Sequence, residues 1–112
     1  MAQNFKNQLA RNTGTSPVDI LDQADSFDTV VGIRCSNVHA SSAINVSVYI
    51  INSTGHTTTY LIKSAPIPLG SSLELIDGGS KIILKSGDKI TAVSDQASSL
   101  DTVVSYIDAI ST

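Results

Sequence analysis

The sequence has no tryptophan and a single cysteine, and only 4% of its residues are aromatic and 15% are charged. Since one cysteine cannot form an internal disulfide, we expect Cys35 to be a small buried side chain rather than a reactive thiol. No window contains the roughly 18 consecutive apolar residues of a membrane-spanning helix, and the first residues lack the apolar run of a signal peptide. These absences predict a chain made in the cytoplasm, without a membrane partner.

The charge balance and the missing motifs exclude further classes of function. Lys and Arg number 7 against 10 Asp and Glu, for a net charge of −3, whereas proteins that bind a phosphate backbone carry a basic patch. Nucleic acid is therefore not an expected partner. His39 and His56 have no metal-ligand spacing, and no serine lies in a nucleophile elbow. We predict no enzyme activity and no cofactor.

Four aspartates recur at every third position, which raises the question of a cation site: Asp19, Asp22, Asp25 and Asp28. Carboxylates hold a hard cation only where they converge, as in a dedicated calcium loop. Strands and a turn at these positions would not bring them together. The spacing is interpreted as a solvated acidic edge, with no metal.

Alternating hydrophobic residues are the strongest positive signal. Of the 112 residues 41% are hydrophobic, enough for the core of one compact domain. In residues 44–51, Ile44, Val46 and Val48 alternate with other side chains, which predicts a strand with one buried face. The predicted core residues are Val31, Ile33, Cys35, Ile44, Val46, Val48, Ile50, Leu73 and Leu75.

The same alternation marks eight short strands without a connecting amphipathic helix. They cover residues 18–21, 27–36, 44–51, 56–63, 72–75, 81–84, 89–93 and 101–110. The loop at 52–55 predicts an antiparallel hairpin, with Tyr60 and Ile62 facing inward. Pro66 and Pro68 exclude a central strand at that point. The fold class is therefore all-β, an antiparallel β-sandwich, and jelly-roll and immunoglobulin-like topologies both remain open.

Residues 1–16 are polar and lack strand periodicity, so we expect an extended N-terminal arm there and a sandwich over residues 17–112. Phe5, Leu9 and Arg11 are the expected partner-binding residues of that arm. Several apolar residues also lie opposite the presumed core faces, namely Ile51, Ile76, Ile83, Val104 and Ile110. Burial against another chain would account for them, which predicts a homo-oligomer such as a closed ring or a trimer.

Segments along almost the whole chain are similar to a known family. They include Asn4-Phe5-Lys6-Asn7, Val46-Ser47-Val48-Tyr49-Ile50, Pro66-Ile67-Pro68-Leu69-Gly70-Ser71-Ser72-Leu73 and Ser86-Gly87-Asp88-Lys89-Ile90. The chain resembles small accessory structural proteins of tailed bacteriophages, especially those of marine bacteria. The resemblance implies a non-enzymatic virion protein that binds other virion subunits, made in the host bacterial cytoplasm and carried as a capsid decoration or cement protein. The alternative is a neck, tail or fibre component, including a carbohydrate-binding module for host recognition.

Overall fold

The computed structural model describes residues 3–21, 28–52, 54–76 and 81–109. The strands in these ranges are β1 (Gln3–Thr13), β2 (Val18–Leu21), β3 (Asp28–Asn37), β4 (Ile44–Ile51), β5 (Thr58–Ile67), β6 (Ser72–Glu74), β7 (Ile82–Leu84), β8 (Lys89–Ser94) and β9 (Leu100–Ala109). Every strand pair is antiparallel. The predicted all-β antiparallel fold is confirmed.

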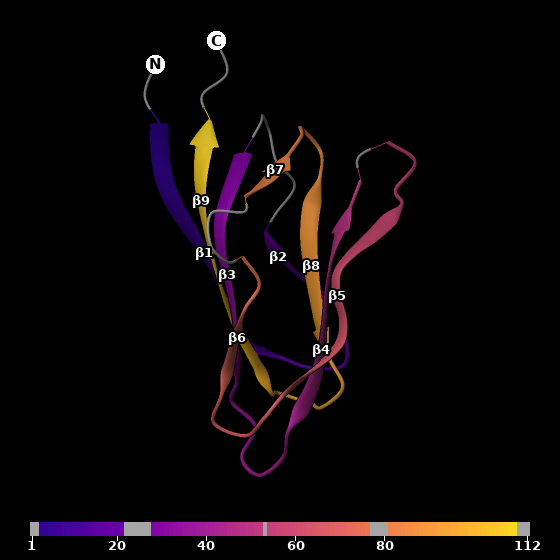
Figure 1. The fold of residues 1–112 in the computed structure, drawn as a ribbon. Helices are drawn as coiled ribbons and strands as arrows, with labels where there is room; N and C mark the ends of the chain where they lie inside the picture. The colour runs from indigo at the N-terminus through magenta and orange to yellow at the C-terminus, as the bar shows by residue number, and fades with distance from the viewer. Residues whose placement is uncertain (1–2, 22–27, 53, 77–80, 110–112) are drawn as a thin grey trace.

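Two sheets pack face to face (Figure 1). One has the strand order β1-β9-β3-β6, with β7 also paired to β3, and the other has the order β2-β8-β4-β5. The first two strands of an immunoglobulin-like sandwich share a sheet, whereas here β1 and β2 lie in opposite sheets. The chain passes from one sheet to the other after almost every strand. The exceptions are the β4–β5 hairpin and the step from β6 to β7, which both pair with β3. This order is that of a jelly roll.

The core lies between the inner faces of the two sheets. From β3 come Ile33 and Cys35, and from β4 come Ile44, Val46 and Val48, all fully buried. The other predicted core residues Ile50, Leu73 and Leu75 are partly buried and pack against this cluster. Branched aliphatic side chains from alternate positions thus fill the space between the sheets, as the period of two requires.

Val31 is the exception among the predicted core residues. Its side chain is 37% exposed, while its neighbour Val30 is fully buried. The register between β3 and β9 shifts between Val30 and Gly32, so Val31 is the extra residue of a β-bulge. A bulge moves the alternation by one residue. The inward positions are therefore Val30 before the bulge and Ile33 after it.

Residues 3–13, which the sequence places in an arm, form strand β1 at the edge of the first sheet. This strand pairs with β9 continuously from Gln3 opposite Ala109 to Ala10 opposite Thr102. The alternation is hard to recognise in the sequence because the large apolar residues of β1 point outward. Gln8 and Ala10, opposite the buried side of β9, are polar or small. The structure therefore has a strand where the sequence predicts an arm, because hydrogen bonding to β9, rather than apolar burial, orders this segment.

The end of β1 is tied to the β8–β9 loop. The N–H of Ser99 donates to the carbonyl of Thr13 at 3.0 Å, and the N–H of Ser94 donates to the carbonyl of Gly14 at 2.9 Å. A Cβ on Gly14 would lie only 3.2 Å from the nitrogen of Ser98, so this close approach of two backbones favours glycine. The crossover from β1 to β2 is fixed at the lower end of the sandwich in Figure 1.

Some of the apolar residues expected opposite the core faces are buried and others are exposed. Val104 and Ile76 are buried, and Ile51 is half-buried, while Ile83 is 65% exposed. Ile110 lies outside the described residues. The expectation for Val104 was wrong because Val103 and Val104 are adjacent, and a period of two alone cannot decide which of them faces inward.

Strand β5 differs from its expected course. It continues through Pro66 to the buried Ile67, because β5 is an edge strand and an edge tolerates a residue without an N–H. Register shifts against β4 occur on both sides of Val48. At the irregularity Ser64 has a φ of 53°, and its N–H donates to the Ser47 hydroxyl at 2.9 Å. The shifts leave Tyr60 half-exposed instead of facing inward.

The bulge in β3 makes a direct prediction about two adjacent valines. Val30→Thr places a hydroxyl in the core, and we expect it to lower the free energy of unfolding by about 1–3 kcal/mol. Val31→Thr changes an outward side chain and should stay within about 0.5 kcal/mol of the wild type. Urea denaturation of both variants tests this. A larger loss for Val31→Thr than for Val30→Thr would place the bulge elsewhere.

Candidate interaction surface

The outward side of the first sheet carries an unusual number of exposed apolar side chains. Phe5 is 78% exposed, Leu9 66% and Val103 40%, and they are joined by Ile83 and Val31. We call these five residues the outer apolar face. Because the strands are in register, Phe5 lies opposite Ile107, and Leu9 lies opposite Val103. Exposed apolar groups are common singly, but a patch across adjacent strands is typical of an interaction site.

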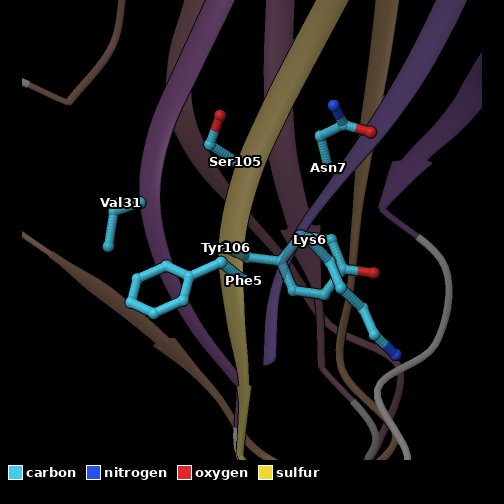
Figure 2. A pocket seen from close by; sticks show the side chains of 6 residues that line it. All are labelled: Phe5, Lys6, Asn7, Val31, Ser105 and Tyr106. Atoms are coloured by element: carbon cyan, nitrogen blue, oxygen red, sulfur yellow. The ribbon is translucent and has the colours of Figure 1, made fainter. Parts of the chain in front are cut away.

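A shallow hollow of about 570 Å³ lies at this face and is lined by Phe5, Lys6, Asn7, Val31, Ser105 and Tyr106. Figure 2 shows the Phe5 ring reaching from β1 across β9 toward Val31 on β3. The hollow forms because the small residues Ser105 and Gly32 lie opposite each other on β9 and β3 and leave space above the sheet. The bulge in β3 therefore also shapes this surface, because it turns the Val31 side chain outward beside Phe5.

The charged groups around the hollow are paired with one another. The Lys6 ammonium lies 2.7 Å from the Asp108 carboxylate, and this hydrogen bond lowers the pKa of Asp108. On β3, Arg34 lies 3.6 Å from Glu74, whose other oxygen accepts the N–H of Ile33 at 2.9 Å. The Lys6–Asp108 pair lies on the inner side of the sheet, with Gln8 and Ala10, whereas Arg34 and Glu74 neutralise each other on the outward side. The outward side therefore offers mainly apolar contact to a partner.

The three predicted anchors are all on β1. Phe5 and Leu9 both point outward from β1, with the outward position Asn7 between them. Arg11 is exposed at the register shift that follows Ala10. Sequence reasoning missed Val103 and Val31 as surface residues. Both depend on the register with a partner strand, which the sequence does not encode locally. In the adjacent pairs Val30-Val31 and Val103-Val104 the sequence reasoning assigns the wrong valine to the core, because a period of two cannot choose between neighbours.

Cys35 and His39 have structural roles. Burial, with a smaller contribution from the charge of Glu74, raises the pKa of the Cys35 thiol to about 12. A thiol in that state is not a nucleophile near neutral pH. The His39 ring nitrogen Nδ1 accepts the N–H groups of Ser41 and Ser42 and so closes a loop. These interactions stabilise the fold and leave no activated group at either residue.

The aspartate series does not form a cluster in the described chain. Asp19 is on β2 in one sheet, where it accepts hydrogen bonds from Thr91 and Lys89, and Asp28 is on β3 in the other. Asp22 and Asp25 lie outside the described residues. Among the residues that the structure describes, no three His, Cys, Asp or Glu side chains are grouped so that they could hold a metal ion.

The carbohydrate alternative depends on an aromatic platform, and the nearest candidate is the pair Tyr49 and Tyr60. Their ring centroids are 5.3 Å apart, with the planes tilted by 60°. The Lys63 ammonium lies 5.1 Å from the centre of the Tyr60 ring. Sugar rings stack on a flat, open aromatic face. Two tilted rings, one of them already in contact with a cation, do not offer one.

No helix in the described part of the chain is long and apolar enough to cross a membrane. No family model and no curated protein sequence matches the chain. Several solved structures share its fold.

Three of these structures illustrate the range. The capsid of the Helicobacter pylori bacteriophage KHP30 aligns with a TM-score of 0.59 and 10% identity over 99% of this chain and 90% of that one. The infectious bursal disease virus VP2 subviral particle gives a TM-score of 0.55 at 7% identity, over 94% and 32%. A Drosophila nucleoplasmin-like core, described for pentamer formation and histone binding, gives 0.52 at 9% identity, over 98% and 100%. At identities this low, the similarity shows a shared jelly-roll fold and nothing further about this chain.

The buried thiol makes a prediction of its own. Cys35 in the native protein should react with a thiol reagent such as dithionitrobenzoate far more slowly than the same cysteine in denaturant, because it is both inaccessible and protonated. The ratio of the two rates at neutral pH measures this. Equal rates would mean that the Cys35 side chain is not buried in the core of the sandwich.

Proposed function

We propose that the chain is a non-enzymatic structural protein of a virus particle, bound to other virion subunits as a capsid decoration or cement protein. The observation that carries the proposal is the outer apolar face, where Phe5 and Leu9 expose most of their side chains on a well-formed strand. A side chain of that size buried on assembly contributes about 1.5–3 kcal/mol. Such a surface fits a permanent neighbour better than a soluble substrate.

Two further observations support a virion role. The segments that are similar to tailed-phage accessory proteins run along almost the whole chain, and the fold is shared with viral capsid proteins. Jelly rolls also serve other functions, so the fold alone does not assign one. The proposed oligomer is a closed assembly of identical chains, and no observation supports a trimer over other symmetries.

The virion subunit to which the chain binds determines the position of the chain in the particle. A capsid decoration protein lies on the head, whereas the alternative neck, tail or fibre component would separate with the tail. No specific feature of the described residues favours the alternative, because the Tyr49–Tyr60 pair does not form an open platform. The proposal assigns the chain to the head because the capsid protein of a bacteriophage shares its fold.

Incorporation into particles tests the proposal. Particles of the virus that encodes the chain, produced with the wild-type protein, should contain it after gradient purification, and separated heads should retain it. Phe5→Ser with Leu9→Ser should leave folding unchanged, because both side chains are exposed, yet reduce incorporation at least tenfold. Mass spectrometry of the particles measures the amount.

The matched control is Leu69→Ser, which also removes an exposed apolar side chain but lies in the loop between β5 and β6. It should be incorporated like the wild type. Wild-type chain found free in the infected-cell lysate and absent from purified particles would contradict a virion role. Recovery with tails would move the chain to the alternative position.

A further inference from the structure

We propose that β1 pairs antiparallel with β1 of a second copy of this chain, about a twofold axis at Asn7. The inference deepens the proposed function, because it names a partner for the outer apolar face and uses the same Phe5 and Leu9. Its test is nevertheless independent, since association of the purified protein does not require any other virion subunit.

The argument begins with the other sheet edges, which are protected. An open edge presents unpaired N–H and C=O groups, and proteins guard such edges with short strands, bulges and prolines. Strand β2 has 4 residues and a register shift, and β6 and β7 have 3 residues each. Strand β5 is longer, but it contains Pro66 and the irregularity at Ser64.

Strand β1 has no proline and no register shift between Gln3 and Ala10, and the one charged side chain in that stretch, Lys6, is paired with Asp108 of its own chain. It spans 11 residues, and its pairing with β9 is regular from Gln3 to Ala10. In Figure 1 it is the outermost strand of its sheet. The register shift beyond Ala10, where Asn12 has a φ of 56°, ends the regular edge. Among the edges that the structure describes, β1 is the one long and regular edge, and it is where strand addition is easiest.

The sequence of β1 then selects a register. A twofold axis perpendicular to the sheet keeps the outward residues of both copies on one face, so opposing residues must have numbers of equal parity. An axis at Lys6 would set two ammonium groups directly opposite each other, which is unfavourable. An axis at Gln8 would set Phe5 against Arg11, beyond the regular part of the strand.

An axis at Asn7 avoids both problems. Phe5 then lies opposite Leu9 of the second copy, and Leu9 opposite Phe5, so the two most exposed apolar residues of the strand cover each other twice. Asn7 faces its own counterpart, where the two amides can exchange hydrogen bonds. Lys6 lies opposite Gln8, without a like-charge contact. The paired stretch runs from Asn4 to Ala10 and stops where the regular edge stops.

Site-specific crosslinking tests this register. Across an antiparallel pair the two Cα atoms are about 4.5–5.5 Å apart, within the range that a disulfide spans. Asn7→Cys should therefore form a disulfide-linked dimer under mild oxidation. Ser105→Cys is the matched control, because it lies in the same row on β9. Three strand spacings would separate it by about 14 Å from its counterpart, so this variant should form no disulfide-linked dimer.

A second variant tests the contact without a crosslink. Asn7→Lys places two ammonium groups opposite each other at the axis, whereas Ser105→Lys adds the same charge one strand away. Sedimentation should find a dimer for the wild type and for Ser105→Lys. Asn7→Lys should be monomeric, with the melting temperature that the wild type shows at concentrations where it is dissociated.

The proposal would be overturned by a wild type that stays monomeric at every concentration, or by equal crosslinking of Asn7→Cys and Ser105→Cys. A monomer that still enters virus particles would overturn the β1 dimer and leave the virion role standing. A dimer with the Asn7 register that is absent from particles would support the pairing and contradict the virion role.

Discussion

The pairing of β1 with β9 is the interaction on which the architecture depends. A strand buried in a sheet needs hydrogen-bond partners on both sides, and β9 obtains them from β1 and β3. The hydrogen bonds from Ser99 to Thr13 and from Ser94 to Gly14 fix the end of β1 to the loop that precedes β9. The N-terminal segment is thus part of the sandwich, and the open side of β1 becomes the sheet edge.

The sequence predicts the sandwich well wherever one strand face is buried. The bounds of β2 and β4 coincide with the expected ranges 18–21 and 44–51, because alternating β-branched residues stand between clear turn signals. The topology could not be predicted from the sequence. It depends on which strands pair across long separations, and the alternation within a strand carries no information about its neighbours.

The errors have one physical origin, which is that side-chain direction depends on the partner strand. The bulge at Val31 is visible only against β9, and the choice between Val103 and Val104 requires the same register. The sequence of β1 predicts an arm because its inner positions are polar or small. Backbone pairing with β9, rather than apolar burial, orders this strand. Phe5 and Leu9 were recognised as candidate anchors since they are isolated large apolar residues, and the structure places both on one exposed face.

The features argued for assembly fit one physical picture. The charge of Arg34 beside the outer apolar face is neutralised within the chain by Glu74, and Lys6, on the inner side of the same sheet, is paired with Asp108. The bulge turns Val31 outward beside Phe5, and the small residues Gly32 and Ser105 leave room for an inserted side chain. Apolar area, paired charge and an open strand edge are what a subunit of a larger particle needs, whereas a soluble monomer would be expected to hide them.

Amide hydrogen exchange along β1, followed as a function of protein concentration, tests the central claim most directly. Half of the β1 amides, those directed at β9, should be protected at every concentration because they belong to the sandwich. The alternate amides, directed away from β9, should exchange rapidly in dilute protein and become protected as the concentration rises. Rapid exchange of all β1 amides at every concentration would contradict the account, since the segment would then be an unpaired arm rather than the edge of the sheet.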